Sequence, residues 1–369
     1  MEGVRMSSEP NSSLLERVRS PFEGPNTLGN SNGFWLTFGV GVVSLALYPV
    51  LFGTYAAGER AVFLVYALLG VSLCFVWGFC GILSFGQVAF FGVSGYTFGI
   101  VGLNVSSYTG VTLGIVAGIA VATLFAAALG YFMFYGGVRD VYVTIITLVV
   151  ALVLKTFMDQ TAGGEWAIGE AELGGFNGMR NIPNLAIGVG DVGIDVSRAM
   201  HYYVALAALI AVYLGLRVLV NGRFGYAMVA TREDETRTEM FGYNTTLIKF
   251  VTFTLGGALA GLSGVLYVTW GNYIDPQQFA ITAASMPVIW ASIGGRDSIA
   301  GTMAAAIVLQ WIELQLTGEW ALVIVGSLLV FVILAMPEGI APRLRTFVLD
   351  RQSSSEPATA PATTEEVTD

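Results

Sequence analysis

The chain has 369 residues, of which 55% are hydrophobic and only 12% are charged, and its mean hydropathy is +0.70. An ordinary soluble domain carries about 25% charged residues, so this composition excludes that class and predicts an all-α, polytopic protein of the cell membrane. The net charge is −9, with only two lysines among the 17 basic residues; such an acidic balance suits a salt-rich cytoplasm and suggests a halophilic archaeon as the source.

Residues 1–33 are polar and contain Pro10, Pro21 and Pro25. They lack the apolar core of a signal peptide, so no cleaved leader is expected. We predict that this segment is a polar N-terminal tail in the cytoplasm.

From residue 34 to residue 342, apolar runs reach or approach the roughly 20 residues that a helix needs to cross about 30 Å of hydrocarbon. We expect about ten spans, which together form one transmembrane domain. The predicted spans are Phe34–Gly53, Ala61–Phe79, a third that ends at Leu103, Val111–Phe134, Val141–Met158, Tyr202–Val220, Leu247–Trp270, Ala283–Ile293, Ile299–Leu314 and Ala321–Met336.

Two of these regions are predicted to be discontinuous. In GFCGILSFGQVAFFGVSGYTFG, residues 78–99, each glycine weakens a helix by up to about 1 kcal/mol relative to alanine, and we expect a break at Gly81–Gln87. A second interruption is expected from Pro287 to Gly301, in the other half of the chain. Paired interruptions in the two halves indicate a translocation path. The candidate path residues are Ser84, Gln87, Ser94, Tyr96, Pro287, Trp290 and Arg296. The polar side chains among them have an alternative role, a hydrogen bond between neighbouring helices.

Basic residues gather in the N-terminal tail, in the connection 222–243 and at the C-terminal end. Because cytoplasmic loops are enriched in arginine and lysine, all three are expected in the cytoplasm, which ten spans allow. The acidic connection 159–200 is then extracellular. Residues 343–369 are expected to form a disordered cytoplasmic tail, since the last part is rich in Ser, Thr, Pro, Ala and Glu without periodicity.

The sequence offers little chemistry for an enzyme. Neither lysine follows a glycine, so there is no phosphate-binding P-loop. His201 is the only histidine, and we expect Cys74 and Cys80 to be buried free thiols rather than metal ligands. We therefore expect no catalytic residue, no bound cofactor or metal, and no nucleic-acid partner. Ionisable residues such as Lys155 and Glu313 lie only near span ends, which disfavours a carrier driven by a coupling ion.

The connection Gly222–Tyr243, GRFGYAMVATREDETRTEMFGY, concentrates charge between two apolar spans. It has no proline, and no glycine between Tyr226 and Phe241, so we predict one short helix with apolar ends and a charged middle. Such a helix suits docking into a groove on a partner protein; the alternative is a solvated helix that holds two spans apart. The candidate docking residues are Phe224, Arg232, Glu233, Asp234, Glu235, Arg237, Glu239, Phe241, Gly242 and Tyr243.

Two blocks of sequence carry a resemblance to a known family. The glycine-rich segment 78–99 and the block FGYAMVATREDETRTEMFGYNTTLIKFVTFTLGGALAGLSGVLY resemble the permease subunits of ABC importers for branched-chain amino acids and urea, over most of residues 60–340 and most strongly over 222–302. The resemblance implies that 222–243 couples the permease to ATPase subunits that bind the ATP. It also implies two such ATPases, a second homologous permease subunit and an extracellular solute-binding protein.

Finer motifs favour the urea or short-chain-amide branch of that family. REDETRTEMFGY, VIWASIGGRDSIAGT at 288–302 and LGGFNGM at 173–179 are similar to segments of urea permeases, although Asp297–Ser298 departs from their pattern. The alternative is a permease for branched-chain amino acids, and a more distant one is a stand-alone channel or secondary carrier. The sequence therefore predicts an importer subunit for a small polar solute, with urea as the expected substrate.

Overall fold

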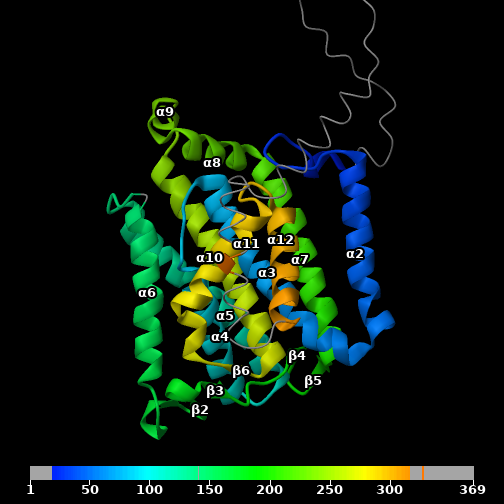
Figure 1. Cartoon of the computed structure of the whole chain (residues 1–369). Helices are drawn as coiled ribbons and strands as arrows, with labels where there is room; N and C mark the ends of the chain where they lie inside the picture. The colour runs from blue at the N-terminus through cyan, green and yellow to red at the C-terminus, as the bar shows by residue number, and fades with distance from the viewer. Residues whose placement is uncertain (1–18, 140, 316–325, 328–369) are drawn as a thin grey trace, which may run out of the picture.

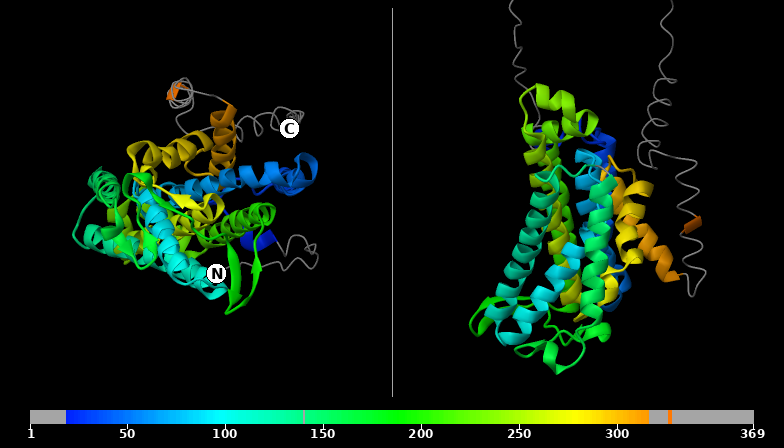
Figure 2. Two further views of the ribbon diagram at one scale, coloured as in Figure 1. Left: turned by 90° about the horizontal axis from the view of Figure 1, so that it is seen from below. Right: turned by 90° about the vertical axis from the view of Figure 1, so that its left-hand side faces the viewer.

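The computed structural model describes residues 19–139, 141–315 and 326–327 (Figure 1). Long helices form a bundle with two short helices across one end and small β-hairpins at the other (Figures 1 and 2). The long helices are α2 (Asn32–Phe52), α3 (Thr54–Cys80), α4 (Gln87–Asn104), α5 (Tyr108–Phe134), α6 (Val141–Asp159), α7 (Arg198–Asn221), α10 (Thr245–Gly271), α11 (Ile281–Gly294) and α12 (Ile299–Gln315). The short helices across the end are α8 (Arg223–Glu233) and α9 (Glu235–Met240).

The first nine predicted spans each overlap one of these long helices, which confirms the helical, polytopic class. Within the described residues, six helices are long and apolar enough to cross a membrane, and α11 and α12 are shorter apolar helices. The tenth predicted span, 321–336, lies outside the described residues except for 326 and 327. The number of crossings therefore stays a prediction.

The core is built on α3, which is buried along most of its length and packs against α7, α10 and α12, and on the mutual packing of α4, α5 and α10. Small residues allow these helices to come close, among them those of the GGALAGLSG segment of α10. A Cβ atom on Gly257 would lie 2.2 Å from the Cβ of Ala126 in α5, and one on Gly264 would lie 2.1 Å from the carbonyl oxygen of Phe91 in α4. Neither position has room for a side chain.

The break predicted at Gly81–Gln87 is confirmed. Helix α3 ends at Gly81, whose φ of +78° suits glycine, and α4 begins at Gln87. The Ser72 hydroxyl donates a hydrogen bond to the Gln87 amide oxygen at 3.2 Å. Ser72 lies eight residues before the end of α3, so the chain turns back into the bundle and α4 starts inside it.

The second interruption differs from the prediction. Pro287 lies inside α11, which continues to Gly294, and the helix is interrupted on either side of α11 instead. On the α10 side the chain passes through β6 (Tyr273–Ile274) and the 3₁₀ helix η4 (Pro276–Phe279). Proline occupies the seventh position of a 14-residue helix, where it removes one hydrogen bond without ending the helix.

The breaks define two interrupted pairs of helices, α3 with α4 and α10 with α11, and these pairs run in opposite directions. Helix α3 ends near Arg232 of α8, and α4 then leads away to the hairpin end, where the Asn104 amide donates to the Ile168 carbonyl at 2.7 Å. Helix α10 starts beside α9 and ends at β6, after which α11 returns toward the α8 end. Opposed pairs of this kind are one feature of transporters built from inverted repeats.

The connection 159–200 contains short strands that sequence reasoning did not predict. The pairs are β1 (Ala167–Ile168) with β2 (Ala171–Glu172), β3 (Met179–Arg180) with β6, and β4 (Ala186–Val189) with β5 (Val192–Asp195), all antiparallel. Met179 pairs with Ile274, which ties this connection to the end of α10. These sheets lie at the end opposite α8 and α9 (Figure 1).

The described part of the N-terminal segment, residues 19–31, packs against α7. The Arg217 guanidinium, only 1% exposed, donates hydrogen bonds to the Phe22 carbonyl at 2.8 Å, the Gly29 carbonyl at 3.1 Å and Asn30 Oδ1 at 2.9 Å. Arg217, which falls inside the predicted span Tyr202–Val220, is therefore a buried anchor for this segment. The segment includes the 3₁₀ helix η1 (Ser20–Phe22) and lies at the α8 end of the bundle (Figure 1).

Candidate functional site

Helices α8 and α9 lie across one end of the bundle (Figures 1 and 2). The prediction of one continuous helix is wrong, because the backbone of Asp234 is extended, with φ −159° and ψ 100°. Its carboxylate accepts a hydrogen bond from the Arg237 amide at 2.9 Å and so caps α9. Aspartate favours this capping position, and that preference was the signal in the sequence.

The end of α9 exposes large apolar side chains. Met240 is 81% exposed, Phe241 77% and Tyr243 55%. Gly242 between them has a φ of +87°, so the chain reverses direction there before α10 begins. Exposed apolar patches mark protein or membrane contact sites, so these side chains make the end of α9 a candidate contact surface.

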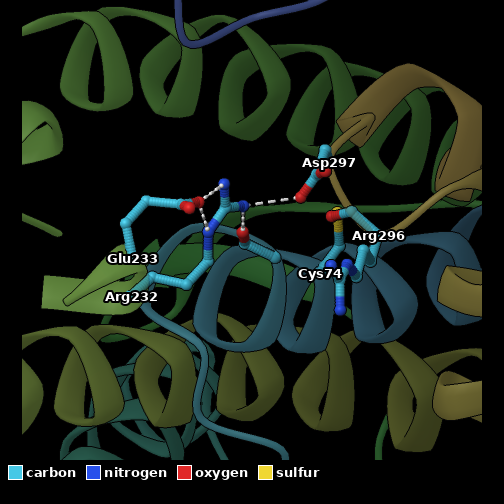
Figure 3. Close-up of polar contacts among 6 residues, drawn as sticks. Cys74, Arg232, Glu233, Arg296 and Asp297 are labelled. Atoms are coloured by element: carbon cyan, nitrogen blue, oxygen red, sulfur yellow. Dashed lines mark hydrogen bonds and ion pairs between the residues drawn. The ribbon is translucent and has the colours of Figure 1, made fainter. Parts of the chain in front are cut away.

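Arg232, at the end of α8, connects three parts of the molecule (Figure 3). One guanidinium nitrogen bonds Asp297 Oδ1 at 2.6 Å, in the turn between α11 and α12, and also the Gly78 carbonyl oxygen in the last turn of α3. The other nitrogens bind Glu233 Oε1 at 2.6 and 3.1 Å. Arg232 thus joins the charged connection to both interrupted pairs.

The turn at 295–298 is itself packed tightly against α3. The Cys74 thiol donates to the Arg296 carbonyl oxygen at 3.2 Å, and a Cβ on Gly78 would lie 1.9 Å from the same oxygen (Figure 3). The Arg296 side chain is exposed at the α8 end. Arg296, predicted as a path residue, thus lies beside α8, and its role in the path stays a prediction.

Two contacts fasten α9 to α10. Lys249 and Glu235 form an ion pair at 2.6 Å, with side chains only 13% and 33% exposed, and the Thr245 hydroxyl donates to Glu239 Oε1 at 2.6 Å. A movement of α9 therefore reaches α10 directly, in addition to the route through Arg232.

The other predicted path residues do not gather at one place. Ser84 Oγ accepts a hydrogen bond from the Gly86 amide within the break, and Ser94 donates to the Gly261 carbonyl at 2.6 Å. Ser94 therefore has the alternative role, a bond between α4 and α10. Tyr96 stacks on Phe279 with ring centroids 6.0 Å apart. The translocation path stays a prediction.

A cavity of about 150 Å³ lies where the first turns of α4 and α11 meet α3 and α12. Of the predicted path residues it includes only Trp290. Sequence reasoning missed Tyr66, Gln278 and Glu313 as its polar lining, and only the position of Glu313 in an apolar span could have drawn attention to it. No group of three or more His, Cys, Asp or Glu that could hold a metal occurs in the described residues.

The helical bundle, its two interrupted pairs and the connecting arginine define a multi-pass membrane protein of the transporter type. Residues 60–333, well over half of the chain, match the family described as branched-chain amino acid transport system / permease component. The chain belongs to this family and is a multi-pass protein of the cell membrane.

The curated relatives carry corresponding names. The chain is 25% identical to the high-affinity branched-chain amino acid transport system permease protein LivM of Salmonella typhimurium, covering 82% of this chain and 74% of that protein. It is 26% identical to LivM of Escherichia coli, over 76% of this chain and 69% of that protein. It is also 26% identical to LivH of Escherichia coli, over 75% of this chain and 91% of that protein. No solved structure matches the chain.

These matches support the permease class and the branched-chain alternative rather than the urea expectation. The family description and the relatives named above refer to branched-chain amino acids, and none refers to urea. The motifs that favoured urea lie in the connections 222–243 and 159–200 and in the 288–302 segment. The matches give no support to a halophilic archaeal source either.

Proposed function

We propose that this chain is one of two membrane subunits of an ABC importer for branched-chain amino acids. Its family and the names of its relatives support this class and substrate. The observation that carries the mechanism is α9, which exposes Met240 and Phe241 while Arg232 beside it is bonded to both interrupted pairs.

In this proposal a cytoplasmic ATPase subunit docks on the end of α9. Each of the two permeases takes one ATPase, and those partners bind the ATP. When the ATPases close, α8 and α9 move, and Arg232 transmits the movement to the end of α3 and to the 295–298 turn. The interrupted helices then shift, so that a central path opens alternately to either side.

The opposite end of the bundle receives the amino acid. We propose that an extracellular binding protein docks on the hairpins of residues 159–200 and releases its ligand there. Because the binding protein holds the substrate first, the permease needs only weak affinity for it.

The direct test uses the complete importer, co-expressed with its ATPase and second permease subunits and reconstituted in liposomes. We expect ATP-dependent uptake of radiolabelled leucine, isoleucine or valine, and none of urea. Phe241→Asp places a charge on the docking surface and should abolish co-purification of the ATPase. Val192→Asp, at an equally exposed site on β5, is the matched control and should leave co-purification intact.

Two results would count against the proposal. Uptake by this chain alone without ATP would identify a channel or secondary carrier. Normal assembly and uptake in Phe241→Asp would remove the docking role of α9.

A further inference from the structure

The cavity beside Trp290 lies between the two interrupted pairs. Val88 and Phe91 contribute from the first turns of α4, Ala283 and Met286 from the first turns of α11, and Leu69 from α3. It is therefore formed where elements of the first and second halves of the chain meet, and transporters with paired interruptions hold their substrates at such an interface.

One side of the cavity is apolar. Leu69, Val88 and Phe91 are at most 3% exposed, and Met286 completes this wall from α11. A cavity of 150 Å³ is of the size that holds a benzene-sized group in a protein interior. The four-carbon side chain of leucine, or a shorter branched chain, fits such a space.

The other side is polar and negatively charged. Glu313 and Gln310 reach it from α12, and Gln278 from η4, with its amide nitrogen 3.1 Å from the Tyr267 hydroxyl. In the described part of the chain, Glu313 has no ion-pair partner. An ionisable side chain that lines a cavity among apolar helices, even near the end of a span, is a candidate for binding a ligand.

Aromatic rings and a helix end supply the rest of the surroundings. Tyr66 and Trp290 lie with ring centroids 5.7 Å apart, and such rings attract an ammonium group. Helix α11 has no side-chain cap at its N-terminus, so the unpaired amide groups of its first turn favour a carboxylate. The cavity thus offers Glu313 to an ammonium group, the start of α11 to a carboxylate, and apolar side chains to an aliphatic group.

We propose that this cavity binds the zwitterion of an aliphatic amino acid, with its ammonium group at Glu313, its carboxylate toward the start of α11 and its side chain against Leu69, Val88 and Met286. This inference rests on the proposed function and names the contacts of its substrate. Urea has neither a charge for Glu313 nor a side chain for the apolar wall.

The cavity lies on the extracellular side of the contact between α3 and the 295–298 turn, and this contact closes the path to the cytoplasm in the proposed mechanism. Along α3, Tyr66 and Leu69 line the cavity, and Cys74 and Gly78, further toward α8, pack against the 295–298 turn. Along α12, Glu313 lies 14 residues beyond Ile299, or about 21 Å at 1.5 Å per residue. Opening the contact held by Arg232 would release the ligand toward the cytoplasm.

The test measures ligand binding to the complete detergent-purified importer without its binding protein. Radiolabelled leucine is displaced by leucinol, which keeps the ammonium group, or by 4-methylpentanoate, which keeps only the carboxylate. We expect leucinol to compete better than 4-methylpentanoate in the wild type. Glu313→Gln should weaken leucine binding at least tenfold and remove that preference, and Glu165→Gln, on an exposed extracellular residue, is the control.

A second variant tests the apolar wall independently of the charge. Met286→Phe fills part of the cavity and should shift the ratio of valine to leucine binding at least threefold toward valine. The inference is overturned if wild-type importer transports leucine but both variants, folded and assembled, bind it unchanged. If the wild type transports none of the three branched-chain amino acids, the proposed function itself fails.

Discussion

At the scale of single residues, the contacts of Arg232 join α8 to the end of α3 and to the 295–298 turn. Its side chain is 22% exposed and its partner Asp297 43%. A pair this exposed contributes about 1 kcal/mol or less to stability. Its importance therefore lies in what it joins, since it links α8 to a turn that is 65 residues away in sequence.

Asp297→Asn should uncouple ATP hydrolysis from transport. The change keeps the shape of the side chain but removes the charge that faces Arg232, so α8 can move without the 295–298 turn. We expect uptake by the reconstituted importer to fall at least fivefold with ATPase activity retained, and with little change in Tm. Glu59→Gln is the control, because it breaks a comparably exposed ion pair, with Arg198, away from α8. Equal uptake in both variants would show that Asp297 does not transmit force.

Gly78→Ala should destabilise the protein, since the new Cβ would lie 1.9 Å from the Arg296 carbonyl oxygen and that atom belongs to the backbone. The turn must then move away from α3, with the loss of the Cys74 and Arg232 contacts. We expect a Tm several degrees lower in detergent, corresponding to about 1–3 kcal/mol for overpacking. Gly215→Ala in α7, where nothing lies within 4 Å, should leave Tm unchanged or raise it. Similar Tm values for the two variants would contradict the close approach.

At the scale of elements, apolar length and glycine content were sufficient to locate the long helices and the break before α4. These features reflect local costs: burying a backbone in lipid requires a helix, and clustered glycines weaken one. The position of the second interruption was misjudged because Pro287 was taken as a helix breaker. In a bundle, neighbouring helices compensate for the hydrogen bond that proline removes.

The residues of the cavity could not be found in this way. Tyr66, Gln278 and Glu313 are far apart in sequence, belong to three elements and follow no shared spacing. Their meeting depends on how α4 and α11 enter the bundle, which is a property of the packing. The β-hairpins were missed for a related reason, since strands of two to four residues carry almost no periodicity.

The break between α8 and α9 leads to a prediction at this scale. Asp234→Ala removes the cap of α9, which costs about 1 kcal/mol, and favours a single straight helix that points Met240 and Phe241 elsewhere. We expect the affinity for the ATPase subunit, measured by titration in detergent, to fall at least fivefold with global Tm unchanged. Asp234→Asn retains a capping oxygen and should bind like the wild type. An unchanged affinity in Asp234→Ala would mean that the bend does not set the docking surface.

At the scale of the whole molecule, the two ends of the bundle differ in chemistry. Both ends have ion pairs, but the α8 end exposes the apolar side chains of Met240 and Phe241, and the other end has hairpins with exposed valines such as Val189 and Val192. The importer requires the first end to face the ATPases and the second to face the binding protein. The orientation therefore follows from the proposed function as well as from the arginine distribution.

This orientation can be measured with single cysteines and a membrane-impermeant maleimide. The two native cysteines, Cys74 and Cys80, are buried and should not react. Val192→Cys, 82% exposed in the wild type, should be labelled in intact cells, and Phe241→Cys, 77% exposed, only after the membrane is opened. Labelling of position 241 from outside would invert the molecule and place α9 out of reach of any cytoplasmic ATPase. Labelling in the expected order makes α9 available to that partner and leaves the hairpin end open to an extracellular one.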